Sequence, residues 1–199
     1  RNKPAALSAM LLAMNGHGGM RVGSVSMSTD GSQVASGGGD GRVVVWDAAS
    51  GAQLHAMEGG HGGRPVSSVS MSGDGTRVAS GGGDGRVVVW DAASGAQLFA
   101  MNGHGGRWVT SVSMSADGTR VASGGDDRRV VVWDAASGAQ LHAMEGGHGG
   151  RPVSSVSMSG DGTRVASGGG DGRVVVWDAA SGAQLHAMEG GHGGRPVSS

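Results

Sequence analysis

Short apolar runs separated by glycine-rich turns make up most of this chain. Apolar residues alternate with serines in the first run of the segment 61–104, which predicts a strand with one buried face. The third run is three valines and a tryptophan without interruption, a pattern typical of a strand covered on both faces. The runs predict four strands, at residues 66–72, 77–80, 87–90 and 97–101. The predicted turns between them are residues 73–75, 81–85 and 92–95.

This four-strand pattern repeats along the whole chain. The tetrapeptide Val-Val-Trp-Asp ends at Asp47, Asp91, Asp134 and Asp178, in steps of 44, 43 and 44 residues. Residues 42–98 and 129–185 are identical. Four antiparallel strands per repeat of this length are typical of a β-propeller blade. The fourth strand is the most polar, with His55, His142 and His186 where the second repeat has Phe99, which suits the outer edge of a blade.

Composition alone would suggest a disordered chain. Glycine contributes 43 of 199 residues, and Leu, Ile, Val and Phe together contribute 33. The net charge is only −1, however, and the glycines recur in register with the repeat, which favours an ordered fold. The near-neutral charge gives no indication of nucleic-acid binding, and no apolar stretch is long enough to cross a membrane. The chain has no cysteine, which excludes disulfides and thiolate metal sites. We expect no cofactor and a cytoplasmic location.

The repeat divides residues 1–199 into one all-β domain. We expect units at about 15–58, 59–101, 102–145 and 146–188, with a partial strand at 5–14 and a partial unit at 189–199. The segment 5–14 could instead be the apolar part of a signal peptide. A strand explains it better, because residues 13–17 are identical to residues 100–104, so the segment lies where every other repeat has a strand. We therefore expect a fragment of a larger propeller, able to self-associate through open blade ends.

The motifs of each unit resemble those of the WD-repeat β-propeller family. They are, in the second unit, Gly60-His61, Asp74-Gly75, Ser80, Asp84 and Trp90-Asp91, and the step from the His to the Trp is 29 residues in all four units. The resemblance implies a buried hydrogen-bond chain of Trp, Ser, His and Asp in every unit. The matching residues are His17, Ser36, Asp40, Trp46, His61, Ser80, Asp84, Trp90, His104, Ser123, Asp127, Trp133, His148, Ser167, Asp171 and Trp177.

The sequence also departs from the family pattern. Methionine stands where the family usually has an aromatic residue at the end of the first strand, at Met27, Met71, Met114 and Met158. Methionine fills gaps but specifies shape poorly, so we expect a softer core. Four units are few for a family whose closed propellers most often have about seven blades, within the known range of about four to eight.

Single motifs suggest several catalytic and ligand-binding functions. A structural role in the repeat explains each of these motifs better. Ser, His and Asp together suggest a serine hydrolase, but a catalytic site has no reason to be copied into every unit. The glycine-rich segment 81–85 lacks the nine-residue period of calcium-binding repeats and the Gly-Lys-Ser/Thr ending of a nucleotide loop. His55 and His61 could chelate a metal, but no third ligand type clusters near them.

The third unit differs from the others at three positions in two loops. Trp108 stands where the other units have Arg or Pro, and Asp126 and Arg128 stand where they have Gly. Both loops open on the same face of a propeller, and tryptophan and arginine are enriched at binding hot spots. Neutral drift after duplication is the alternative, and the sequence leaves both open.

We therefore expect a non-catalytic protein–protein interaction scaffold. An alternative is a structural or ligand-sensing array attached to an effector domain outside this sequence, which would present one epitope many times. The expected partner-binding residues are Arg107, Trp108, Asp126 and Arg128, with Arg64 and Arg151 as secondary contacts.

Overall fold

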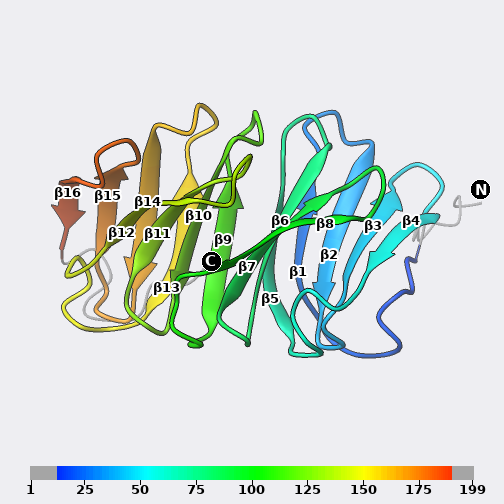
Figure 1. The fold of residues 1–199 in the computed structure, drawn as a ribbon, viewed down its shortest axis with the longest axis horizontal. Coiled ribbons are helices and arrows are strands. Elements are labelled where there is room, and N and C mark those ends of the chain that lie inside the picture. Colours follow the sequence, from blue (N-terminus) through cyan, green and yellow to red (C-terminus); the bar gives the residue numbers. More distant parts are fainter. Residues whose placement is uncertain (1–12, 190–199) are drawn as a thin grey trace, which may run out of the picture.

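Four twisted antiparallel sheets make up the computed structural model, which describes residues 13–189 (Figure 1). Blade 1 contains β1 (Val22–Met27), β2 (Gln33–Gly38), β3 (Val43–Asp47) and β4 (Gln53–Met57), and blade 2 contains β5 (Val66–Met71), β6 (Arg77–Gly82), β7 (Arg86–Asp91) and β8 (Gln97–Asn102). Blade 3 contains β9 (Val109–Met114), β10 (Arg120–Gly125), β11 (Val130–Asp134) and β12 (Gln140–Met144), and blade 4 contains β13 (Val153–Met158), β14 (Arg164–Gly169), β15 (Val174–Asp178) and β16 (Gln184–Met188). The described part of the chain contains no helix that could cross a membrane.

Each sheet pairs its strands in chain order, so the first and fourth strands are edges. This confirms the all-β prediction of four-stranded antiparallel units and the outer-edge position of the polar fourth strand. The first strands β1, β5, β9 and β13 lie next to one another across the blades, and the sheets fan out from them.

One predicted turn is wrong in part. The second strand of blade 2 continues through Gly81 and Gly82, which the sequence pattern assigns to the turn 81–85. A Cβ atom at Gly81 would lie 2.6 Å from a methyl carbon of Val109 in the next blade. A Cβ atom at Gly82 would lie 2.6 Å from a ring nitrogen of His61. These glycines therefore serve close packing within a strand rather than chain reversal.

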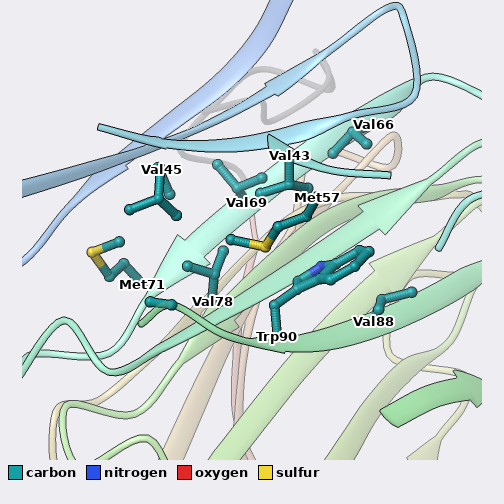
Figure 2. Close-up of a cluster of buried hydrophobic side chains, with 11 residues drawn as sticks. Val43, Val45, Met57, Val66, Val69, Met71, Val78, Val88 and Trp90 are labelled. Carbon is teal, nitrogen blue, oxygen red and sulfur yellow. The ribbon is translucent and has the colours of Figure 1, made fainter. Parts of the chain in front are cut away.

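The hydrophobic core lies between neighbouring blades. Figure 2 shows Val43 and Met57 of blade 1 against Val69 and Trp90 of blade 2, and all four side chains are at most 5% exposed. Equivalent clusters join blades 2 and 3 and blades 3 and 4. The third strand alternates its side chains between the two clusters beside it, which explains its unbroken apolar sequence.

Polar bonds reinforce the same interfaces. Backbone N–H groups of one inner strand donate to serines of the preceding one, from Val69 to Ser24 at 3.1 Å and from Met71 to Ser26 at 3.0 Å. Blades 3 and 4 repeat both bonds. The guanidinium of Arg77 donates to the carbonyl of Gly118 in the next blade at 3.1 Å. These bonds add to the apolar packing that joins neighbouring blades.

Contacts at the outer rim explain the variable residue of the fourth strand. Phe99 packs against Gly138, in the turn of the next blade. His142 occupies the equivalent place one blade later, where its Nε2 donates to the carbonyl of Ala180 at 2.8 Å. His55 lies in the same way against Gly95. The histidine at this position is therefore an inter-blade contact.

Candidate functional site: the blade 3–4 loop face

A buried hydrogen-bond chain links the four motif residues of blade 2. The indole Nε1 of Trp90 donates to Ser80 Oγ at 2.8 Å, and Ser80 Oγ lies 2.8 Å from His61 Nε2. His61 Nδ1 lies 2.9 Å from Asp84 Oδ1. A carboxylate can only accept, so Nδ1 carries the proton and Nε2 accepts from the serine hydroxyl. Ser80 and His61 are fully buried.

The same connections are present in the other three blades, between the residues that the sequence pattern selects. Both ring nitrogens of each histidine and the serine hydroxyl have partners inside the blade. The arrangement satisfies the buried histidine and serine groups, which is a structural role, while Oδ2 of Asp84, Asp127 and Asp171 is buried without a hydrogen-bond partner. Among residues 13–189, no three His, Asp or Glu side chains come together as a cation site.

Gly60 of the Gly-His motif makes room for the network. A Cβ atom there would lie 2.5 Å from two ring carbons of Trp90. The indole therefore lies directly on the glycine, and a larger residue would displace it from the serine.

The Asp of the Trp-Asp motif has a separate role that sequence analysis did not assign. Asp91 accepts from the backbone N–H of Ser94 at 2.8 Å and from its hydroxyl at 2.6 Å, which closes the turn before β8. These two bonds lower the pKa of Asp91 below its ordinary value. The regular Asp-x-x-Ser spacing was the signal that could have identified it.

Two of the loop residues that distinguish blade 3, Asp126 and Arg128, border a cavity at the junction with blade 4. This junction cavity has a volume of about 520 Å³. Its walls are His104, Gly105, Arg107, Asp126, Asp127, Arg128, Arg129, Gly150 and Pro152. The two loops of blade 3 are tied together by a bond from the Asp126 N–H to the Trp108 carbonyl at 2.9 Å. Three of the expected binding residues, Arg107, Asp126 and Arg128, therefore share one cavity.

Arg128 adopts a backbone conformation that arginine rarely takes. Its φ of 72° is the one positive value among non-glycine residues of the described chain. At the equivalent Gly85, a Cβ atom would lie 2.7 Å from Gly106 in the next blade. Arg128 carries a Cβ, so blades 3 and 4 cannot make the same close approach at this position. Backbone strain of this kind costs about 1–3 kcal/mol and clusters at functional sites.

Trp108 lies on the other side of blade 3. Its ring packs over Gly83 of blade 2, where a Cβ atom would stand 2.8 Å from the indole. The side chain is nevertheless 44% exposed. The residue does not line the junction cavity, so the expected binding residues divide between two neighbouring blade junctions.

The charges at the cavity are only partly compensated. Arg129 pairs with Glu145 at 2.6 Å. Burial raises the pKa of Asp127, but its hydrogen bonds to His104 and to the backbone N–H of Arg129 outweigh this, and the net pKa is lowered. Arg107, Arg128 and Asp126 are exposed, and within residues 13–189 their side chains make no hydrogen bond or ion pair.

The remaining two expected binding residues lie elsewhere on the loop face. Arg64 and Arg151 are exposed in the loops that correspond to the one carrying Arg107. Neither lines the junction cavity.

Successive four-stranded sheets with the same internal Trp-Ser-His-Asp chain define the blades of a β-propeller. The family model described as "WD domain, G-beta repeat" matches residues 9–47, 51–91, 95–134 and 138–178, and the chain belongs to this family. Each later match begins with the outer strand of the preceding blade, so the family repeats overlap the sheets.

A solved structure, "Structure of U3-55K", resembles this chain with a TM-score of 0.78 and 25% sequence identity. The match covers 88% of this chain and 53% of the U3-55K chain, so this chain spans about half the length of that structure. A search of curated proteins found no match. Proteins with WD propellers generally serve as protein-interaction scaffolds and are typically non-catalytic.

Proposed function

We propose that this protein is a non-catalytic scaffold that binds a partner protein through the loop face of blade 3. The observation that carries the proposal is the strained Arg128 beside the junction cavity. Three otherwise near-identical blades show that glycine is the unstrained choice at this position. The exposed Trp108 and Arg107 add the residue types that dominate binding energy at protein interfaces.

The residues of blade 2 at the equivalent positions provide matched substitutions for a test of this proposal. Replacing Trp108 with Pro, Asp126 with Gly and Arg128 with Gly gives blade 3 the loop residues of blade 2. We expect this triple variant to fold at least as well as the parent and to lose capture of partner proteins from a cell extract. Ala116→Gly is the control, because it also restores the residue of blade 2 but lies in the turn after β9.

The proposal fails if the triple variant captures the same proteins as the parent. Thermal melts of both variants show whether a loss of capture comes from unfolding. The single variant Trp108→Ala should weaken capture by about 1–3 kcal/mol without lowering the melting temperature, since truncations outside the core change stability little.

Self-association through the open face of blade 1 is a second proposal, and one observation favours it. Val25 and Met27 on β1 are 67% and 57% exposed, whereas their counterparts Val69 and Met71 are 5% and 6% exposed against the preceding blade. We expect a second copy of the chain to cover these exposed side chains. Light scattering of the purified chain should show oligomers, and Val25→Asp should reduce them. A monomer at micromolar concentration contradicts this proposal.

A further inference from the structure

We propose that the junction cavity binds the side-chain carboxylate of an acidic peptide segment, held by Arg107 and Arg128. This inference rests on the proposed function and specifies the chemistry of the partner. Both arginines border the same cavity of about 520 Å³, and neither pairs with an acid within the described residues. A guanidinium presents paired N–H donors that match the two oxygens of a carboxylate.

Three arginines border the cavity, and within the described residues Arg107 and Arg128 are the two without an ion pair. Arg129 also borders the cavity, but Glu145 already accepts from its Nε at 2.6 Å. The equivalent arginines Arg42 and Arg173 make the same pair with Glu58 and Glu189, so that pair is part of the repeat. Arg128 has no equivalent in another blade, because glycine occupies its position there.

The acidic residues of the cavity favour a carboxylate over a phosphate. Asp126 and Asp127 both border it, and Oδ2 of Asp127 is buried without a hydrogen-bond partner. A phosphate group with almost two negative charges would meet stronger repulsion from these carboxylates than a singly charged side chain. A peptide also carries backbone N–H groups, which can donate to the free carboxylate of Asp126. The cavity thus offers donors for the acidic side chain and an acceptor for the adjacent main chain.

The geometry around Arg128 supports recognition by a prearranged site. Its φ of 72° holds the residue in the turn between β10 and β11, and its backbone N–H donates to the Gly125 carbonyl at 3.1 Å. The backbone position of the side chain is therefore fixed, and less ordering is required when a ligand binds. Gly150 and Pro152 of blade 4 form the facing wall.

The test uses the purified chain and capped peptides of alternating Glu and Gly. The comparison peptides contain Gln or phosphoserine in place of Glu. Binding is measured by nuclear magnetic resonance, from the shifts of the arginine Nε–H signals. We expect the Glu peptide to move the signals of Arg107 and Arg128, and to bind at least tenfold more tightly than the Gln peptide at low salt.

Two variants place the interaction at the cavity. Arg107→Gln and Arg128→Gly should each weaken binding of the Glu peptide at least tenfold, while Ala116→Gly leaves it unchanged. Equal binding of the Glu and Gln peptides, no binding up to millimolar concentration, or unchanged binding by both arginine variants would overturn the proposal. Tighter binding of the phosphoserine peptide would overturn the choice of carboxylate.

The outcome is separable from that of the proposed function. If the triple variant loses partner capture but the Glu peptide does not bind the parent, the scaffold proposal stands and the ligand chemistry is wrong. If the Glu peptide binds at the arginines but the triple variant still captures its partners, the cavity is a real site that does not serve as the scaffold surface.

Discussion

Replacing Trp90 with Phe tests whether the buried hydrogen-bond chain stabilises each blade. The substitution removes the only donor that reaches Ser80 from the core, across a bond of 2.8 Å. Trp90 is 2% exposed, and Ser80 and His61 are fully buried, so water does not readily replace the lost partner. The aromatic character of the side chain is kept, which limits the change to one N–H group and part of one ring.

The structure allows the magnitude to be estimated in two parts. Ser80 keeps its bond to His61, so only one acceptor site loses its partner, at about 1–2 kcal/mol, the lower part of the range for an unpaired buried group. The smaller ring leaves a void of a few tens of cubic ångströms, which adds about 1 kcal/mol. The free energy of unfolding should therefore fall by about 2–3 kcal/mol. Ser80→Ala should cost at least as much, because it leaves both the indole and the imidazole unpaired.

The assay is urea unfolding of the purified chain, followed by circular dichroism. Trp108→Phe is the matched control, since that indole is 44% exposed, and it should change stability by less than about 0.5 kcal/mol. The double variant Trp90→Phe with Ser80→Ala should lose less than the sum of the single losses, because both remove the same bond. Equal losses for Trp90→Phe and Trp108→Phe, or strictly additive losses in the double variant, would refute the reasoning.

Three further predictions follow from local geometry. Hydrogen bonds from Ser and Thr side chains and backbone lower the pKa of Asp30 and Asp161 to about 2. The unfolded chain binds protons first as the pH falls, so stability should decline between about pH 4 and pH 2, and Asp161→Asn should flatten this decline in urea titrations. Gly60→Ala should lower the melting temperature by several degrees because its Cβ would overlap the indole, whereas Gly160→Ala, with its nearest neighbour at 3.7 Å, should not. Arg128→Gly should raise stability by about 1 kcal/mol in urea unfolding by removing the strain, and an unchanged value would contradict it.

The strands were predictable because their signals are local. Alternation of apolar residues and serines identified β5, and the uninterrupted valines identified β7 as covered on both sides. The motif resemblance selected the residues of the hydrogen-bond chain, such as His61 and Asp84, which are 23 positions apart. Periodicity alone could not pair them, since it gives the face of a strand and not the partner of a side chain.

The inter-blade bonds were not predictable for the same reason. The alternating pattern predicts that the serines of the inner strands face solvent. Instead, Ser24 and Ser26 accept hydrogen bonds from backbone N–H groups 45 residues later in the chain. Glycines were a further source of error. Gly82 looked like a turn residue, and only the structure shows the histidine ring that occupies the space of its missing side chain.

Identical segments of the chain can be compared in different structural surroundings, because residues 42–98 and 129–185 have the same sequence. Arg42 and Arg129 begin identical segments and both pair with the glutamate at the end of the fourth strand. Arg42 also lies 4.0 Å from Asp40, whereas no such pair forms between Arg129 and Asp127. The residue that precedes each segment is the nearest difference, glycine in blade 1 and the strained Arg128 in blade 3. Under the proposed function, partner specificity comes from such departures in blade 3, because a motif shared by all four blades cannot distinguish one blade from another.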